Sequence, residues 1–381
     1  MAYDFSALKN HIDNFVIGKI APFADILILY KGEEVYRYTT GYTDEEKKIP
    51  YTTDQLLDVY SASKVITCTA GMIAMEQGLF LPGDPVSDYI PDFGKYYIKK
   101  ENGKEEIVEN DLPPVIQDLF SMSAGLDYNR QAKEIVDVVK ANPNATTKDI
   151  ILSYAKRPLA FKTEEKWCYS LCHDVLAYVI EVASGMRFAD FVKKYIFEPL
   201  EMNNSYFHLP KEMEDKKAQK FQYYYSRGKY EPTISKNLFV FTDNYDSGGA
   251  GVITNINDYK KFAYALVNGG VGKNGKKIIS RQSIDLMRTN VLDEKRLASY
   301  RADKNNYCYG YGFGVRVKMD PGRGGNLARE GEFGWDGAAG FLVSLEPEND
   351  LAILYAQHTL DPHNYENHNR IRNLVHLALF D

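Results

Sequence analysis

The sequence predicts an α+β fold, in which helices flank an antiparallel β-sheet and an all-helical region is inserted within the chain. Segments with strand-like composition occur near both ends, within residues 24–42 and 310–356. Between residues 112 and 197, apolar residues recur instead with the spacing of helices. Strands from the two ends can complete one sheet when the ends meet, so we expect a discontinuous sheet domain.

The N-terminal part of the chain predicts a helix, a β-hairpin and a second helix. Residues 4–18 have apolar side chains at helical spacing, and two apolar runs, 24–29 and 35–42, flank the turn of the hairpin. The second helix begins at Ser61, and Gly78 stands where a left-handed C-terminal cap is expected. Its broad apolar surface indicates that this helix is buried.

The middle of the chain predicts helices, and the last third predicts strands separated by glycine-rich turns. We therefore assign residues 1–75 and 240–381 to the sheet domain and residues 76–239 to a mainly helical domain. The further helices are expected at residues 115–120, 132–139, 148–154, 171–182, 188–196, 257–267 and 365–380, and the further strands at 238–241, 310–317, 340–345 and 351–356.

Composition and charge exclude several classes of partner. The 381 residues are 44 % hydrophobic and 26 % charged with a net charge of −6, which gives no reason to expect nucleic acid or an anionic membrane. No stretch approaches the roughly 18 apolar residues of a membrane span. The N-terminus lacks the basic start and apolar run of a signal peptide, so we expect a cytoplasmic protein. Its four cysteines fit reduced thiols better than a disulfide framework.

A serine and a lysine three residues apart, Ser61 and Lys64, open the second helix. On a helix this spacing puts both side chains on one face, one turn apart. A serine hydroxyl becomes a good nucleophile when a neighbouring base takes its proton, and a lysine whose pKa is lowered by burial can be that base. The helix N-terminus adds unpaired N–H groups that can stabilise an oxyanion.

The same spacing of serine and lysine occurs at three other places, which we interpret as chance. These copies begin at Ser6, Ser153 and Ser226, in polar or aromatic surroundings without a long apolar helix behind them. Only Lys64 is expected to lie in the core, where a lysine is costly unless it has a function.

Other motifs are incomplete, and we expect neither a metal nor a cofactor. The segment Cys168–His173 holds two cysteines and a histidine but lacks the second cluster that a zinc site needs. Residues 270–277 nearly match a phosphate-binding loop, but Lys277 stands where a Ser or Thr should hold magnesium, so we interpret them as a hairpin turn.

Ser123 lacks the leading glycine of a nucleophile elbow, which argues against an α/β-hydrolase. Four histidines near the C-terminus are expected at surface or cap positions: His358, His363, His368 and His376.

Two later stretches offer the groups that Ser61 lacks. Tyr169 stands at the start of a predicted helix, and a phenol near a lysine charge can act as base and acid. The stretch Phe333–Gly340 contains several small residues and directly precedes a predicted strand. Small residues at the edge of a strand let a substrate reach backbone N–H groups.

Ser61-Ala-Ser-Lys64, then Tyr169-Ser170, then a Trp-x-Gly strand, in this order, resemble the motifs of the serine β-lactamase-like superfamily. That superfamily contains class C β-lactamases, D-alanyl-D-alanine peptidases and a group of esterases and transesterases. The resemblance implies a β-lactamase/transpeptidase-like fold with the active site in the cleft between the two domains. It also implies that Ser61 is acylated, that Lys64 and Tyr169 relay protons, and that the N–H groups of Ser61 and Ala338 form the oxyanion hole. Five further segments contribute to it: Leu119–Leu126, Glu198–Met202, Ser247–Gly251, Asn274–Ser280 and Tyr309–Phe313.

Two departures from the superfamily's pattern narrow the substrate class. β-Lactamases and peptidases usually carry Lys-Thr-Gly, whose lysine attracts a substrate carboxylate, where this chain has Trp335-Asp336-Gly337. They also usually carry an asparagine that binds an acylamino side chain, where this chain has Leu171. We expect Trp335, Asp336, Gly337 and Leu171 to contact the substrate, and the pattern resembles the esterase and transesterase branch. An arginine from elsewhere in the chain, such as Arg316 or Arg329, could restore the positive charge that the lysine would supply.

Three functional hypotheses follow. The leading one is a serine hydrolase that acts through an acyl-enzyme, as an esterase or acyltransferase on small neutral acyl esters. The alternative is a hydrolase of β-lactams or of D-amino-acid amides and peptides. A third hypothesis, a non-catalytic member that keeps the cleft for ligand binding, is disfavoured because Ser61, Lys64 and Tyr169 are all retained. The expected partner is therefore a small-molecule ester or amide.

Overall fold

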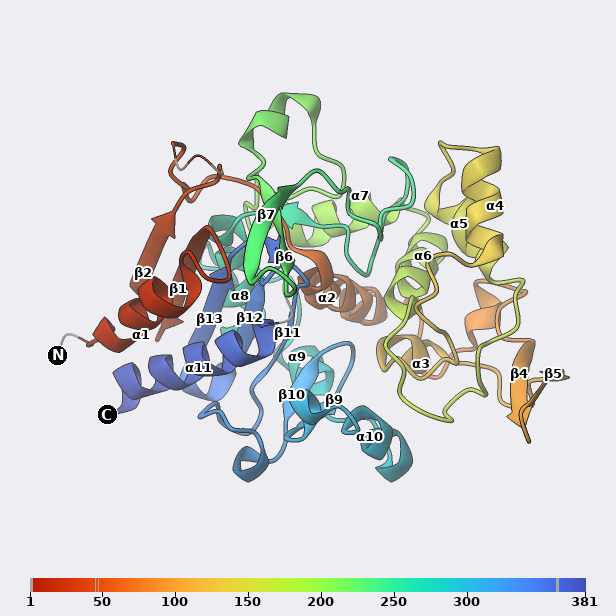
Figure 1. Cartoon of the computed structure of the whole chain (residues 1–381). Coiled ribbons are helices and arrows are strands. Elements are labelled where there is room, and N and C mark those ends of the chain that lie inside the picture. Colours follow the sequence, from red (N-terminus) through yellow and green to blue (C-terminus); the bar gives the residue numbers. More distant parts are fainter. Residues whose placement is uncertain (1–2, 45, 47, 361–362) are drawn as a thin grey trace.

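The computed structural model describes residues 3–44, 46, 48–360 and 363–381, and its architecture confirms the predicted α+β fold (Figure 1). The largest sheet is antiparallel throughout. Its strands lie in the order β2 (Glu33–Gly41), β1 (Phe23–Tyr30), β13 (Leu351–Ala356), β12 (Leu342–Glu346), β11 (Phe333–Asp336), β10 (Arg316–Lys318) and β9 (Tyr309–Tyr311).

The two ends of the chain meet inside this sheet, where β1 pairs with β13. Both strands are buried along their whole length because helices cover both faces. Helix α8 (Ile256–Val267) contacts β1, β12 and β13 on one face. On the other face α1 (Ser6–His11), which continues as a π-helical turn over Ile12–Val16, packs beside α11 (Asn364–Phe380) (Figure 1). Segments from the two ends of the sequence thus build a single layer.

The second predicted helix is α2 (Ser63–Glu76), and its residues 63–74 are all buried. It ends as predicted, with Gly78 in a left-handed conformation at φ +72°. The helix is surrounded because it contacts β11 as well as α6 (Cys172–Ser184) and α9 (Arg281–Met287). Its apolar surface therefore extends around the helix instead of forming one stripe.

The five helices predicted in the middle of the chain are present, and α2 lies between them and the main sheet (Figure 1). The division into domains at residues 75 and 239 stays a prediction. In addition to α6, the helices of this region are α3 (Ile116–Phe120), α4 (Lys133–Ala141), α5 (Thr147–Tyr154) and α7 (Phe188–Val192), which continues as a π-helical turn over Lys193–Phe197.

Two strand predictions were wrong or incomplete, and two hairpins were missed. Residues 238–241 form a turn rather than a strand, and their apolar side chains lie partly at the surface, with Leu238 62 % exposed. The expected strand 310–317 is divided into β9 and β10, because Gly314 turns the chain at φ +84°. Two hairpins were missed because they are short and rich in charged or exposed residues: β4 (Tyr96–Glu101) with β5 (Lys104–Glu109), and β6 (Lys220–Tyr224) with β7 (Lys229–Thr233).

The remaining short elements connect the sheet to the helices. Residues 270–277 form the expected hairpin turn, with Val271 bridged to Lys277.

No helix in the described ranges combines the length and the apolar character needed to cross a membrane. The short elements are β3 (Leu57–Asp58), which pairs with β8 (Ile253–Thr254), together with α10 (Glu294–Tyr300) and β14 (Thr359–Leu360).

Candidate active site

Ser61 lies in a tight turn between β3 and α2. The sequence predicted that Ser61 opens the α-helix, whereas residues Tyr60–Ala62 form a single turn of 3₁₀ helix and α2 begins at Ser63. Tyr60 has φ +46°, which is strained for a residue with a side chain. Its neighbours hold it there, since the Tyr60 hydroxyl accepts a hydrogen bond of 2.9 Å from Nζ of Lys220. The turn presents the Ser61 hydroxyl at a fixed position.

The three residues predicted to be catalytic are brought together around the Ser61 hydroxyl. Nζ of Lys64 donates to Ser61 Oγ at 3.2 Å, and the Tyr169 hydroxyl donates to the same oxygen at 2.7 Å. Lys64 is completely buried and also donates to the carbonyl of Gly249 at 2.7 Å. In contrast, the lysines of the other three copies of the motif, Lys9, Lys156 and Lys229, are exposed.

The charge of Lys64 is balanced by a buried carboxylate on α6. Asp174 accepts hydrogen bonds from the Tyr245 hydroxyl at 3.0 Å and the Ser247 hydroxyl at 2.8 Å. Burial raises the pKa of Asp174, and the nearby Lys64 charge opposes this increase. A side chain at Gly249 would place Cβ 2.5 Å from Oδ2 of Asp174, so glycine is required where this loop passes between the two charged groups.

His173, next to Asp174 on α6, lies in the core. It is buried, contacts Sγ of Cys68 at 3.5 Å, and lies 3.1 Å from the carbonyl oxygen of Phe120. Burial and the Lys64 charge together lower the pKa of His173 to about 3, so its ring is neutral near pH 7. His173 therefore fills the core behind Lys64.

Aromatic residues pack around Tyr169 and hold it in place. Nε1 of Trp335 donates to the Tyr169 hydroxyl at 3.2 Å, and the two rings are stacked with centroids 5.7 Å apart. Tyr128 packs edge-on against Tyr169 at 5.1 Å, and Phe239 stacks on Tyr128 from outside. Burial, with a smaller contribution from Tyr169, raises the pKa of Tyr128 well above its usual value. Nothing in the sequence distinguishes Tyr128 from the other tyrosines among the 29 in the chain, so the sequence analysis missed it.

The end of β11 lies directly against the turn that carries Ser61. A Cβ atom at Gly337 would come 2.3 Å from the carbonyl oxygen of Val59, so only glycine allows this approach. The next residue, Ala338, has an amide group with no hydrogen-bond partner in the part of the chain that the structure describes. Ser61 and Ala338 line the same cavity, where a carbonyl oxygen could accept from both amides.

The cavity beside Ser61 has a volume of about 680 Å³ and is lined by aromatic, amide and charged side chains. Leu171 was expected to contact the substrate, but it does not line this cavity; it is 1 % exposed and packs in the core at the start of α6. Leu171 lies at the N-terminal end of α6, where its side chain is buried, whereas Tyr169 precedes the helix and faces the cavity. The aromatic lining consists of Trp167, Tyr169, Tyr300, Tyr309, Trp335 and Tyr365, and asparagines occur at 305, 306, 364 and 369.

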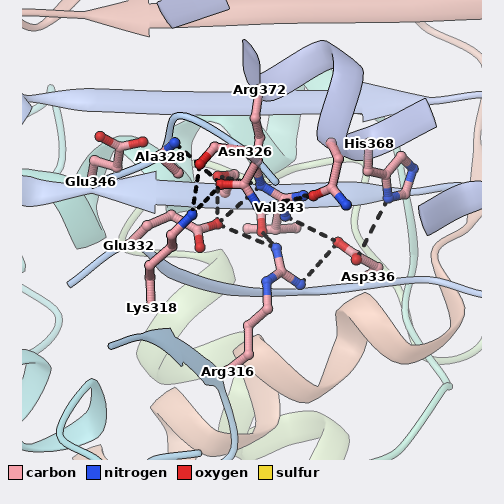
Figure 2. A network of polar contacts seen from close by, with 12 residues as sticks. Arg316, Lys318, Asn326, Ala328, Glu332, Asp336, Val343, Glu346, His368 and Arg372 are labelled. Atoms are coloured by element: carbon pink, nitrogen blue, oxygen red, sulfur yellow. Dashed lines mark hydrogen bonds and ion pairs between the residues drawn. The ribbon is translucent and has the colours of Figure 1, made fainter. Parts of the chain in front are cut away.

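One wall of the cavity contains a cluster of charged residues (Figure 2). Asp336 lies 3.0 Å from Arg316, 3.9 Å from Arg372 and 3.6 Å from His368. Glu332, behind them, lies 3.4 Å from each arginine. Burial would raise the pKa of Asp336, but Arg316, His368 and Arg372 together lower it below its usual range, so this carboxyl is ionised.

The histidine prediction was wrong for three of the four C-terminal histidines. His358, His368 and His376 are buried, and each lies near a carboxylate. His376, for example, is 2.9 Å from Glu346, where polar groups on α11 meet the sheet. Their spacing along the chain gave no sign of this burial, because it arises where α11 and the segment after β13 pack against distant strands.

Comparisons with known proteins agree with this architecture. A sequence model of the Beta-lactamase family matches residues 8–378. Esterase EstB of Burkholderia gladioli is 24 % identical over 349 residues, which are 87 % of this chain and 85 % of EstB. Penicillin-binding protein 4* of Bacillus subtilis is 24 % identical over 328 residues, 84 % of this chain and 64 % of that protein.

Among solved structures, EstCE1, described as a hydrolase with promiscuous acyltransferase activity, superposes with a TM-score of 0.78. It is 22 % identical, and the match covers 96 % of each chain, which establishes the shared fold. The family match extends over nearly the whole chain and includes every element that surrounds Ser61. This protein belongs to the Beta-lactamase family.

Proposed function

We propose that the protein is a serine hydrolase that forms an acyl-enzyme at Ser61 and acts as an esterase or acyltransferase on small neutral acyl esters. The observation that carries the proposal is the double contact of Ser61 Oγ with Lys64 and Tyr169. The likeness to EstB, an esterase, and to EstCE1, a hydrolase with promiscuous acyltransferase activity, supports it.

The reaction uses these residues in two half-reactions. In the first, the relay of Lys64 and Tyr169 takes the proton of Ser61 while Oγ bonds to the carbonyl carbon of the ester. The amides of Ser61 and Ala338 stabilise the oxyanion, and the relay returns the proton to the departing alcohol. In the second, water or an acceptor alcohol loses its proton to the relay and attacks the acyl carbon. The bond from this carbon to Oγ breaks, the relay returns the proton to Oγ, and the acid or a new ester leaves.

The alternative function, hydrolysis of β-lactams or D-amino-acid amides, has the same chemistry at Ser61 and differs in substrate recognition. The likeness to penicillin-binding protein 4* supports it. Trp335 argues against it, because this position presents an aromatic face beside Tyr169 rather than a lysine. A carboxylate placed on that face would lose water without gaining a charged hydrogen bond.

Labelling with a fluorophosphonate, followed by mass spectrometry of the intact protein, tests the nucleophile before any substrate is known. We expect a single adduct on Ser61 and none on the Ser61→Ala variant. Ser226→Ala, at an exposed copy of the motif, is the matched control and should label like the wild type. An adduct on Ser153 or Ser226, or residual turnover of Ser61→Ala above about a thousandth of wild type, would exclude Ser61 as nucleophile.

The choice of substrate is tested with p-nitrophenyl butyrate and nitrocefin. We expect kcat/KM to be at least about a hundredfold higher for the neutral ester, because the aromatic lining favours apolar acyl chains. Equal or faster hydrolysis of nitrocefin would establish the alternative function instead.

A further inference from the structure

The charged cluster at this wall of the cavity, counted together with Glu332 behind it, contains two arginines and two carboxylates in alternation. Arg316 lies between Glu332 and Asp336, at 3.4 and 3.0 Å, and Arg372 lies between the same two carboxylates at 3.4 and 3.9 Å. Both arginine side chains are buried, with exposed fractions of 6 % and 3 %. Because buried arginines stay charged, the two carboxylates neutralise them.

The two carboxylates have different positions relative to the cavity. Glu332 is fully buried, accepts a hydrogen bond of 2.6 Å from the Ser344 hydroxyl, and does not line the cavity. Asp336 lines the cavity, and its side chain is 35 % exposed. Figure 2 shows Asp336 joined to Arg316 and His368 at the edge of the cluster. Asp336 is therefore the acidic member of this cluster that a substrate would meet.

The arginines also retain binding capacity that the described residues do not use. Nη2 of Arg372 is buried and has no hydrogen-bond partner among the described residues, although it lies 3.9 Å from Oδ1 of Asp336. Both ring nitrogens of His368, which is 0 % exposed, likewise lack a hydrogen-bond partner in the described part of the chain. Two guanidinium groups around one carboxylate, with donors to spare, are the usual surroundings of a bound anion.

We propose that Asp336 is a specificity-determining residue whose carboxylate occupies an anion site formed by Arg316, Arg372 and His368, so that the cavity rejects acyl groups that carry a carboxylate. A substrate carboxylate at this wall would meet the like charge of Asp336 while losing its water. The inference deepens the proposed function, on which it rests, and it assigns the preference for neutral acyl chains to one side chain. Removing Asp336 should leave one uncompensated positive charge and open the site to anions.

The first test compares a neutral and an anionic acyl chain of similar length. The probes are p-nitrophenyl hexanoate and mono-p-nitrophenyl adipate, with hydrolysis in buffer subtracted. For the wild type we expect kcat/KM to favour the hexanoate by about a hundredfold, and for Asp336→Ala we expect this ratio to fall by about tenfold or more. Asp336→Asn, which keeps the shape of the side chain, should lower the ratio by about threefold. This variant replaces Asp336→Ala in the test if the alanine variant does not fold.

Asp303→Asn is the matched control. Asp303 also lines the cavity, but it is exposed and its carboxylate accepts from the amide of Asn305 at 2.9 Å rather than from the arginines. Asparagine can keep that capping hydrogen bond. The same loss of one negative charge should therefore change the ratio by less than about twofold. A ratio that is unchanged in both Asp336 variants, or that changes equally in Asp303→Asn, would refute the inference.

A second test does not depend on turnover. Acetate should raise the melting temperature of Asp336→Ala by refilling the anion site, and it should not raise that of the wild type, with chloride at equal ionic strength as the reference. If neither ester is hydrolysed by the wild type, the proposed function fails while this measurement still tests the anion site. If the esters are hydrolysed but acetate has no selective effect and the ratio is unchanged, the anion site fails alone.

Discussion

Lys64 and Tyr169 contact the same hydroxyl oxygen, so each depends on the other in moving the Ser61 proton. We expect Lys64→Met and Tyr169→Phe each to lower kcat by about a hundredfold to ten-thousandfold. The double variant should lose much less than the product of the two effects, because groups that act as one unit are not additive. Lys156→Met, at an exposed copy of the motif, is the control. A Tyr169→Phe variant within about threefold of wild type would show that Tyr169 only lines the cavity.

Trp335 contributes an aromatic face and an N–H group, and two substitutions separate these contributions. Trp335→Phe keeps the face but removes the 3.2 Å hydrogen bond to Tyr169, so we expect kcat to fall by about threefold to tenfold with KM little changed. Trp335→Ala removes the face as well, and should also raise KM for p-nitrophenyl hexanoate more than for the acetate. Steady-state kinetics on both esters measure the difference. An equal change of KM for the two esters would mean that the acyl chain does not contact Trp335.

At the scale of elements, the end of β11 can pack directly against the Ser61 turn only because residue 337 is a glycine. The Cβ of Gly337→Ala would lie 2.3 Å from the carbonyl oxygen of Val59, so the strand end and the turn must separate. Because the amides of Ser61 and Ala338 must converge on one oxygen, we expect kcat to fall by about a hundredfold.

The control for this substitution is Gly83→Ala, where a Cβ would meet no atom within 4 Å. Gly83→Ala should leave the kinetics unchanged. Fluorophosphonate labelling of Gly337→Ala should be slowed rather than abolished, because the nucleophile and its relay remain. Wild-type kinetics for Gly337→Ala would show that the oxyanion is bound elsewhere.

At the scale of the whole molecule, Asp118 links the helical region to the last third of the chain. It lies in α3, accepts from the Val115 amide at 2.9 Å, and faces Arg296 of α10 at 3.9 Å. Burial is the main reason that the pKa of Asp118 is raised from 3.8 to about 6. The folded protein therefore holds this proton more tightly than the unfolded chain does.

A raised pKa contributes stability that is complete below the unfolded pKa and is lost as the pH rises through the folded pKa. Relative to Asp118→Asn, which does not titrate, the wild type should lose up to about 3 kcal/mol of unfolding free energy between about pH 4 and pH 7. Urea unfolding of both proteins across this range measures the difference. Parallel pH profiles would mean that Asp118 titrates normally.

Local patterns were sufficient to predict much of this protein. Apolar runs separated by turns predicted most strands of the main sheet, and the 3.6-residue period predicted the five helices of the middle region. A lysine inside an apolar helix, three residues after a serine, indicated Ser61 and Lys64 because burying an unused lysine is unfavourable. These features depend on residues that are near one another in the chain.

Only the tertiary structure decided which distant residues share the cavity. Asp336 at the end of β11 meets Arg316 of β10 and His368 of α11 there, and behind the cavity Tyr128 packs against Tyr169; no local pattern reports such contacts. For the same reason Leu171 was misplaced, and His358, His368 and His376 were expected at the surface. The sequence by itself determined the elements and the nucleophile motif, because these depend on period and spacing. The charge and shape of the substrate cavity were decided by long-range packing, which brings side chains from separate elements to one wall.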